Sequence, residues 1–363
     1  MFKYLIQIEP LGLLYGSAGR FLSPENLVGR SGMSFPPSSA TVSGVFAAAK
    51  GWKGNNDFCI AGPFWADCDA PQNFYVPTPF HCLVKDDKIH EVMQWHDEEN
   101  CELHDENGQS MIWEDGVWAV REQEKWRSPK NDKFQKGTWM AIGDWEKLRS
   151  GGKPTVKKEP WKVLPHLHPR LDVNERRVAT DLENGSLFLE NAVQMEPGHC
   201  LVYLASEPID DEAVDKINGG WYRLGGEGHM VEIRCTKIGS PVAELLAESV
   251  GDKFALITPA VWGSNRLSRR DPLSHRDWQQ KSWKVKTMLT ERPTPFRYRL
   301  GDHENQKANQ PKRLSRGRYA VSSGTVYVLE EALIEPWVDW SEDWFPREGP
   351  SLKRWGLGLA LAI

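Results

Sequence analysis

The chain has 363 residues, of which 40% are hydrophobic and 26% are charged, a composition typical of a globular protein with one or two domains. It contains no apolar run of about 18 residues, which excludes membrane-spanning helices. Its first residues also lack the long apolar segment of a signal peptide, so we expect a cytoplasmic protein. The six cysteines contain no C-x-x-C pair and no regular framework, so in a cytoplasmic protein we expect reduced thiols. We expect neither a metal nor a cofactor.

The net charge of −5 conceals a strong segregation of charge along the chain. Residues 86–124 hold 13 acidic and 2 basic residues, whereas residues 261–318 hold 15 basic and 5 acidic ones. An acidic protein is a poor general binder of nucleic acid, but the basic segment can supply phosphate contacts locally. A solvated surface loop is the alternative interpretation of that segment. The seventeen tryptophans can anchor cores, interfaces or stacked bases, and for any single one we expect a core position.

The first half of the chain begins with an alternating apolar and polar pattern over residues 2–9, which predicts a half-buried strand. After a loop rich in Gly, Ser and Pro, Ser38 or Ser39 is the expected N-cap of a helix of small residues that ends near Gly51. Residues 73–95 predict two strands around a turn at Asp86-Asp87. Residues 96–190 are charged and poor in periodic segments, which indicates an insertion or a set of hairpins, with a mobile loop over 150–160.

The second half alternates predicted strands and helices. We expect strands over 199–206, 229–237, 254–262, 320–330 and 357–363, and helices over 209–219 and 241–251. Repeated β-α-β units with antiparallel character predict an α+β fold of two ferredoxin-like (RRM-like) modules with an irregular insertion and long loops. The expected segments are 1–95 for the first module, 96–190 for the insertion and 191–363 for the second module.

A glycine-rich run, Leu224-Gly225-Gly226-Glu227-Gly228, lies between a predicted helix and a predicted strand. Glycine permits positive φ and lets backbone N–H groups approach a ligand closely. The run matches neither the P-loop pattern nor the dinucleotide-binding pattern. Taken alone it predicts a tight turn, and Gly356 and Gly358 carry the same ambiguity.

A series of short motifs gives the run more meaning. In chain order they are Ile8-Glu9-Pro10, Gly19-Arg20-Phe21, Phe35-Pro36-Pro37-Ser38, Arg223–Gly228, Thr258-Pro259-Ala260, Ser323-Gly324-Thr325-Val326-Tyr327 and Gly356-Leu357-Gly358. This order resembles the RAMP superfamily of CRISPR effector proteins, and within it the family of third subunits of type III-B Cmr complexes. The equivalent subunits of type III-D complexes are the alternative relatives. No motif falls within 96–190.

The resemblance implies a non-catalytic RNA-binding subunit that caps the 5′ repeat-derived tag of the guide CRISPR RNA. It further implies contacts with the large signalling subunit and the backbone RAMP subunits, an indirect contact with target RNA, and a thumb hairpin, for which Asp86-Asp87 is the candidate. The family often has a basic residue where this chain has His229. We therefore expect the backbone of Gly225–Gly228 to contribute more than the side chain that follows.

Arginines beside flexible loops can bind phosphate in a bidentate manner, and the arginines of 266–270 and 316–318 would meet if their long connection folds back. The residues expected at the RNA are Arg20, Arg30, Ser38, Arg223, Gly225, Gly226, Gly228, His229, Arg266, Arg269, Arg270, Arg316, Arg318, Gly356 and Gly358.

Two other functions are compatible with the sequence. A metal-independent RAMP endoribonuclease that processes CRISPR repeat RNA would use a histidine for acid–base chemistry, but no motif pairs His81, His166, His168 or His229 with a partner group. A structural scaffold would instead use the basic segment to contact an acidic protein. His96, Cys101 and His104 are metal-ligand types without a fourth ligand at a suitable spacing.

Overall fold

The computed structural model has a mixed α+β fold that consists mostly of strands, with three α-helices among the described residues. It describes the whole chain except Met1 and residues 16–34, 53–56, 98–100, 106–108, 114–115, 123–124, 170–171, 173–176, 179–186, 211–218, 227, 265–266, 274–281 and 301–313. The arginines predicted at positions 20, 30 and 266 lie outside the described residues, as does most of the helix expected over 209–219.

The chain forms two compact units, each assembled from three stretches of sequence. Unit 1 comprises Met1–Pro71, Pro160–Ile238 and Arg297–Arg316, and unit 2 comprises Gln72–Glu159, Gly239–Phe296 and Gly317–Ile363. The boundaries expected from the sequence at residues 95 and 190 stay a prediction.

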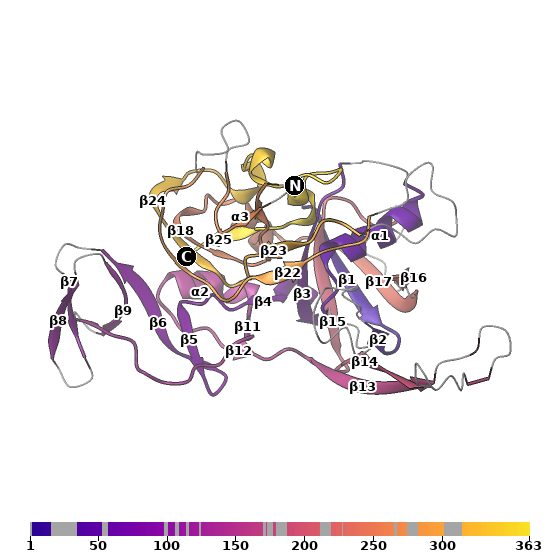
Figure 1. Ribbon diagram of the computed structural model, residues 1–363, viewed down its shortest axis with the longest axis horizontal. Helices are drawn as coiled ribbons and strands as arrows, with labels where there is room; N and C mark the ends of the chain where they lie inside the picture. The colour runs from indigo at the N-terminus through magenta and orange to yellow at the C-terminus, as the bar shows by residue number, and fades with distance from the viewer. Residues whose placement is uncertain are drawn as a thin grey trace. The chain divides into compact units, whose positions relative to one another are not determined.

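Unit 1 is built on a sheet whose strands lie in the order β3-β15-β1-β17-β16 (Figure 1). The strands are β1 (Tyr4–Pro10), β3 (Ile60–Asp67), β15 (His199–Ala205), β16 (Gly220–Leu224) and β17 (His229–Lys237). All neighbouring strands are antiparallel, and the chain visits the first four in the order β1, β3, β15, β17. This is the ferredoxin-like strand order, so the predicted α+β fold class is confirmed, although β15 and β17 come from the segment that the sequence assigned to the second module.

Helix α1 (Ser39–Lys50) connects β1 to β3 and packs against β3 and β16. Val42, Val45 and Phe46 form its buried stripe at helical spacing, and Gly51 ends it in the left-handed conformation with φ 64°. Ser38 occupies the N-cap position as expected, but its side chain caps no backbone N–H; its hydroxyl lies 3.3 Å from that of Thr41.

A second sheet of unit 1 joins β13 (Trp161–Pro169), β14 (Leu187–Met195) and β2 (Leu14–Tyr15). β13 and β14 pair over their whole length and form the long two-stranded ribbon in Figure 1. Of the two alternatives that the sequence left open for this region, an insertion or a set of hairpins, β13 and β14 match the hairpin.

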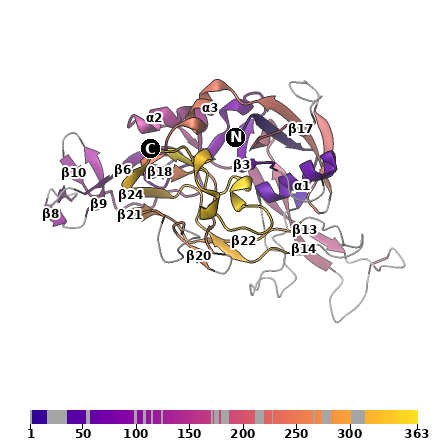
Figure 2. The ribbon, with the colours of Figure 1, turned by 90° about the horizontal axis from the view of Figure 1, so that it is seen from above.

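Unit 2 contains a four-stranded antiparallel sheet in the order β21-β24-β18-β25, in which β21 lies beside β24 (Figure 2). The strands are β18 (Gly251–Leu256), β21 (Val285–Leu289), β24 (Val326–Leu333) and β25 (Ala360–Ala362). This order is again ferredoxin-like, as a fold of two such modules requires. The crossover from β24 to β25 contains three 3₁₀ turns. They are η5 (Trp337–Asp339), η6 (Glu342–Trp344) and η7 (Leu352–Trp355).

An aromatic cluster fills the core of unit 2. Trp283 lies at its centre, with its ring 5.2 Å from that of Trp262, 5.1 Å from that of Trp340 and 5.4 Å from that of Phe254. Among the described residues, six tryptophans are fully buried, namely Trp65, Trp145, Trp262, Trp283, Trp337 and Trp340. The core interpretation is confirmed for these six, since each buries a large apolar surface.

The acidic segment of unit 2 forms a six-stranded sheet in the order β5-β6-β9-β10-β7-β8. Its strands are β5 (Cys82–Lys85), β6 (Lys88–His96), β7 (Cys101–His104), β8 (Ser110–Trp113), β9 (Val117–Glu122) and β10 (Lys125–Arg127). Asp86 and Asp87 have φ values of 51° and 56°, as a two-residue hairpin turn requires, so the predicted turn is confirmed.

Unit 2 also holds shorter elements: η2 (Pro71–Asn73, which straddles the unit boundary), β4 (Tyr75–Pro77), β11 (Trp139–Ala141), η3 (Ile142–Asp144), α2 (Trp145–Arg149), β12 (Val156–Lys157), α3 (Ser240–Ala247), β19 (Trp262–Gly263), β20 (Ser268–Arg269), β22 (Thr294–Phe296) and β23 (Arg318–Ala320). Three expectations were wrong in detail. The strand over 254–262 breaks after Leu256, the strand over 320–330 breaks after Ala320, and the expected loop over 150–160 contains β12, whose Val156 is buried against β11.

Candidate nucleic-acid interface

The glycine run is the turn of the β16–β17 hairpin in unit 1, not a link between a helix and a strand as expected from the sequence. Gly225 and Gly228 have φ values of 74° and 70°, and the Gly228 N–H donates to the Gly225 carbonyl at 3.3 Å. No atom lies within 4 Å of a Cβ built on Gly225 or Gly226, and both glycines are exposed. The backbone of the turn is therefore open to a ligand.

Strand β16 presents two different faces on either side of this backbone. Trp221 and Arg223 are exposed, whereas Tyr222 and Leu224 point to the opposite face, as alternation along a strand requires. The indole of Trp221 is 72% exposed, and Arg223 lies opposite exposed Met230 on β17. Within the described residues, no carboxylate pairs with Arg223, so its guanidinium can bind a phosphate.

Three ring side chains gather at the base of the turn. The Tyr15 ring stacks on His229 at 5.3 Å between centroids and on His166 at 6.2 Å. The Tyr15 hydroxyl also lies 2.7 Å from Nδ1 of His166. The sequence pointed to both histidines but not to Tyr15, because the contact joins residues 151 positions apart. His229 pairs with Leu224, so these rings lie on the face of the hairpin opposite to Arg223. Stacked rings of this kind are a surface on which unpaired bases can stack.

A hollow in unit 1 lies near this group. It is lined by Glu9–Leu13 at the end of β1 and by Gln194–His199 between β14 and β15. The Leu11 N–H donates to the Met230 carbonyl at 3.1 Å, which ties one wall of the hollow to β17.

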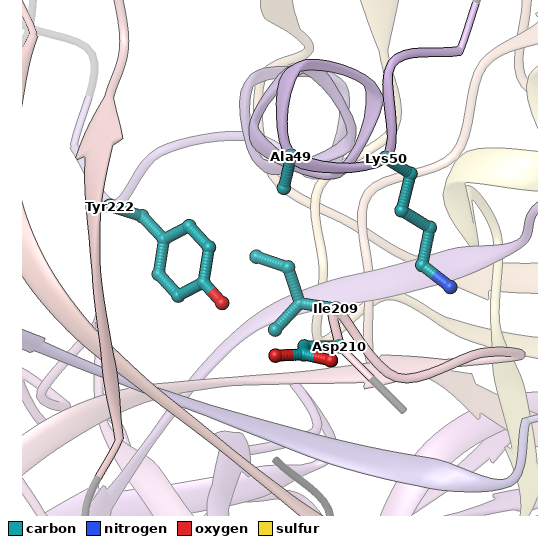
Figure 3. A pocket seen from close by; sticks show the side chains of 5 residues that line it. All are labelled: Ala49, Lys50, Ile209, Asp210 and Tyr222. Carbon is teal, nitrogen blue, oxygen red and sulfur yellow. The ribbon is translucent and has the colours of Figure 1, made fainter. Parts of the chain in front are cut away.

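A second pocket lies between the end of α1 and β16, on the opposite face of the strand from Arg223 (Figure 3). Figure 3 shows the Tyr222 ring directed from β16 toward Asp210 and Ile209. Burial and the charge of Asp210 raise the pKa of the Tyr222 hydroxyl. Lys50 in this pocket pairs with Glu207 at 3.5 Å. Of the described residues expected at the RNA, none lines this pocket.

The basic segment provides a separate exposed surface in unit 2. Arg269 and Arg270 are exposed, and within the described part of the chain no carboxylate pairs with either. β20 lies beside β23, with the Tyr319 N–H donating to the Ser268 hydroxyl at 2.9 Å. Tyr319 is 57% exposed and Leu267 is 62% exposed. The pairing of β20 with β23 therefore brings Arg269 and Arg270 near an exposed aromatic ring and an exposed apolar side chain.

Two other arginines of the expected set differ in accessibility. Arg318 is 5% exposed, and its guanidinium pairs with Glu348 at 2.6 Å, which makes it part of the interior of unit 2. Arg316 is exposed and belongs to unit 1.

The C-terminal glycines are buried. The N–H groups of Gly356 and Gly358 donate to the carbonyls of Lys353 and Pro259, so neither is available to a ligand. The Thr258 hydroxyl donates to the Gly356 carbonyl at 2.5 Å. The motif that includes Thr258 and the motif that includes Gly356 thus form one junction in the core of unit 2, where Gly356 and Gly358 serve packing.

The sequence as a whole matches one known protein family. The family model described as "CRISPR-associated protein (Cas_Cmr3)" matches residues 25–363, nearly the whole chain. The chain belongs to the Cas_Cmr3 family. The resemblance stated from the motifs is thereby confirmed, while a comparison with curated proteins finds no match.

Solved structures resemble the Cas_Cmr3 chain only weakly. A chain of the type III-B Cmr-beta bound to cognate target RNA is 11% identical with a TM-score of 0.42, covering 89% of this chain and 86% of that one. A chain of the Csm3-Csm4 subcomplex in the type III-A CRISPR-Cas interference complex is 10% identical with a TM-score of 0.36, covering 92% and 97%. A chain of the Csm1-Csm4 cassette in complex with AMPPNP is 9% identical with a TM-score of 0.31, covering 91% and 89%. Membership of the family therefore rests on the sequence match over residues 25–363.

Two other histidines, His81 and His96, lie in the interior of unit 2. His81 is buried, and this burial lowers its pKa to about 4. His96 is buried and stacks on Trp126 with 4.5 Å between centroids.

In the part of the chain that the structure describes, no three His, Cys, Asp or Glu side chains gather as metal ligands would. Among the described helices, none is long and apolar enough to cross a membrane.

Proposed function

We propose that the chain is a non-catalytic RNA-binding subunit of a type III CRISPR effector complex, and that it caps the 5′ repeat-derived tag of the guide RNA. Membership of the Cas_Cmr3 family supports the place in the complex. The observation that carries the RNA contact is the open glycine turn flanked by exposed Arg223 and by the stacked rings of Tyr15 and His229.

The turn and its two flanks offer a single-stranded RNA three kinds of contact, with Arg223 on one face of the hairpin and the rings on the other. Its backbone can approach a sugar or phosphate without a Cβ in the way, Arg223 can bind a phosphate, and the rings beside it can stack with a base. Single-stranded RNA is recognised by such combinations of stacking and phosphate contacts. Arg269, Arg270 and Tyr319 offer the same combination on unit 2.

The other expected contacts belong to the same proposal. Arg20, Arg30, Arg266 and Arg316 are proposed to contribute phosphate contacts, and Ser38 to contribute a hydroxyl. The large signalling subunit and the backbone RAMP subunits are the proposed protein partners, and the cytoplasm is the proposed compartment. The hairpin at Asp86-Asp87 is the proposed thumb.

The endoribonuclease alternative has one specific observation in its favour. The Tyr15 hydroxyl and the His166 ring are within hydrogen-bonding distance at 2.7 Å, which is a pairing that acid–base chemistry can use. Incubating the isolated chain with repeat RNA in EDTA separates the two functions. The RNA-holding function predicts intact RNA, whereas cleavage that His166→Asn abolishes would establish the endoribonuclease.

The RNA contacts are tested by charge reversal in the assembled complex. Arg223→Glu tests unit 1, and the double variant Arg269→Glu with Arg270→Glu tests unit 2. The control is Arg347→Glu, because Arg347 is also exposed but pairs with Glu342 at 3.4 Å and with Asp343 at 3.6 Å. We expect both test variants to lose guide RNA relative to the control at 150–300 mM salt, about the range in which phosphate contacts weaken.

The salt dependence gives this test a second readout. Removal of one arginine–phosphate pair should lower the slope of log K against log[salt] by about 0.7 for a single strand. Unchanged RNA content and unchanged slope in both test variants would remove these arginines from the RNA site.

A further inference from the structure

Strand β8 of unit 2 has the features of an unfilled docking edge. In the described part of the six-stranded sheet it pairs with β7 alone, so its other edge has unpaired backbone groups (Figure 1). All four of its residues are exposed, and three are large and apolar: Met111 at 43%, Ile112 at 69% and Trp113 at 44%. Exposed edges are usually protected by lysine, proline or a bulge, and β8 has none of these.

The apolar side chains lie on both faces of the strand. Met111 pairs with Leu103 and Trp113 with Cys101, whereas Ile112 pairs with Glu102 on the alternate face. Leu103 is completely buried, so the sheet has a packed interior directly beside the exposed Met111. A strand added at this edge would extend both the backbone ladder and this apolar layer.

The charge around β8 indicates what kind of strand fits. The sequence places Asp105 and Glu106 before β8 and Glu114 and Asp115 after it, within a segment of 13 acidic and 2 basic residues. Among the described residues, the Ser110 hydroxyl donates to the Glu102 carboxylate on the neighbouring strand. An acidic environment repels RNA and attracts a basic protein segment.

We propose that β8 is a docking edge for an extended, basic segment of another protein subunit, which adds to the six-stranded sheet as an antiparallel or parallel strand. Apolar side chains of that segment cover Met111, Ile112 and Trp113, while its lysines and arginines face Glu102, which pairs with Ile112, and Asp105, which follows β7. The inference goes beyond the RNA-holding function and requires only that the chain works in a protein assembly.

The test uses the full chain in its native assembly, with the photoreactive residue p-benzoylphenylalanine in place of Ile112. The matched control carries the same residue at Ile334, which is 84% exposed at the end of β24 in the same unit. We expect position 112, but not position 334, to crosslink to a peptide of another subunit that is rich in lysine and arginine. A crosslink to RNA, to an acidic peptide or to a second copy of this chain, or no crosslink at all, would overturn the proposal.

A pair of charge variants provides the second measurement. Ile112→Lys and Ile112→Glu both remove the apolar side chain, but only lysine repels a basic partner. We expect Ile112→Lys to retain about ten-fold less of the crosslinked subunit than Ile112→Glu, as a repulsion of roughly one decade in affinity requires. Equal retention in the two variants would contradict a basic partner. Guide RNA is measured in the same samples and should be retained in both variants. Loss of RNA while the protein partner is retained would show that β8 contacts RNA and would overturn the docking edge, whereas loss of RNA from Arg223→Glu tests the RNA function independently.

Discussion

The hydroxyl of Tyr15 lies 2.7 Å from Nδ1 of His166, and the same tyrosine ring stacks on His229 directly after the glycine turn. One side chain from the short strand β2 therefore connects the β13–β14 ribbon with the β16–β17 hairpin in unit 1. Because the Tyr15 ring stacks on both histidines, it is the residue whose change tests this group most clearly.

Substitutions of Tyr15 should separate stacking from hydrogen bonding. Tyr15→Phe keeps the ring and removes the hydrogen bond with His166, whereas Tyr15→Leu removes the ring. If a base stacks here, Tyr15→Leu should weaken RNA binding by about 1–3 kcal/mol and Tyr15→Phe should bind almost as well as the parent chain. Titration of complexes reconstituted with labelled guide RNA measures both. Equal losses in the two variants would exclude stacking as the role of Tyr15.

The close approach of Gly358 to Trp262 predicts a stability effect. A Cβ built on Gly358 would lie 2.7 Å from Cη2 of Trp262, and the glycine has φ 72°. Gly358→Ala should therefore lower the free energy of unfolding by about 1–3 kcal/mol through overpacking, in addition to the cost of the left-handed backbone. Chemical denaturation measures this difference.

The matched control for this substitution is Gly349→Ala. Gly349 has a similar φ of 84°, but nothing lies within 4 Å of its Cβ position. It should show the backbone cost alone. If both variants lost the same stability, the contact with Trp262 would not be the cause.

His81 predicts a pH dependence of stability. Its pKa is about 4 in the folded protein, against 6.5 for an ordinary histidine, because it is buried. As the pH falls below 6.5, the unfolded chain gains a proton that the folded chain refuses, so stability is lost progressively until the pH reaches about 4. The loss should total about 3 kcal/mol.

The test compares the free energy of unfolding of the parent chain with that of His81→Gln. Both are measured at several pH values between 7.5 and about 4, the range in which proton binding by His81 affects stability. The difference between the two should change with pH in the predicted direction, in favour of the variant at low pH. A difference that stays constant would show that His81 does not remain neutral in the folded state.

Acid sensitivity should also arise at Glu91. Burial raises the pKa of this carboxyl, but hydrogen bonds from Arg127 and from the Lys130 N–H outweigh burial, and the net pKa is lowered. The stabilising contribution is therefore present at neutral pH and is lost as the pH falls through the folded pKa. Arg127→Met should leave the carboxylate buried without its partner and reduce stability most at neutral pH, by about 3–5 kcal/mol. Measuring the unfolding of this variant at pH 7 and at about pH 4 tests the sign, and a larger loss at low pH would contradict it.

The fold could be predicted largely because its signals are local. Alternation over 2–9 and 229–237, the small-residue helix that ends at Gly51 and the aspartate pair at 86–87 all reflect the conformational preferences of short segments. The break in the strand expected over 254–262 could not be predicted. Strand β18 ends at Leu256, whose N–H donates to the Thr325 carbonyl and whose carbonyl accepts from the Gly324 N–H. Such long-range hydrogen bonds leave no periodic trace in the sequence.

The candidate site could be predicted only in part, for the same reason. Arg223, the turn glycines and Arg269 stand out by residue type and order. The burial of Arg318 against Glu348 and of Gly358 against Trp262 depends on tertiary contacts that residue type does not reveal. Tyr15 and Tyr319 carry no motif at all, and only the paired strands bring them to the exposed surfaces.

The central claim is that this chain holds the 5′ tag of a guide RNA. The most direct measurement is ultraviolet crosslinking of the native complex, followed by sequencing of the RNA attached to this chain and mapping of the crosslinked peptides. We expect short RNAs with one defined 5′ repeat-derived sequence, attached at peptides that contain Tyr15, the Gly225–Gly228 turn or Tyr319. Recovery of the intact complex with no RNA attached to this chain, or with RNAs of unrelated 5′ sequence, would contradict it.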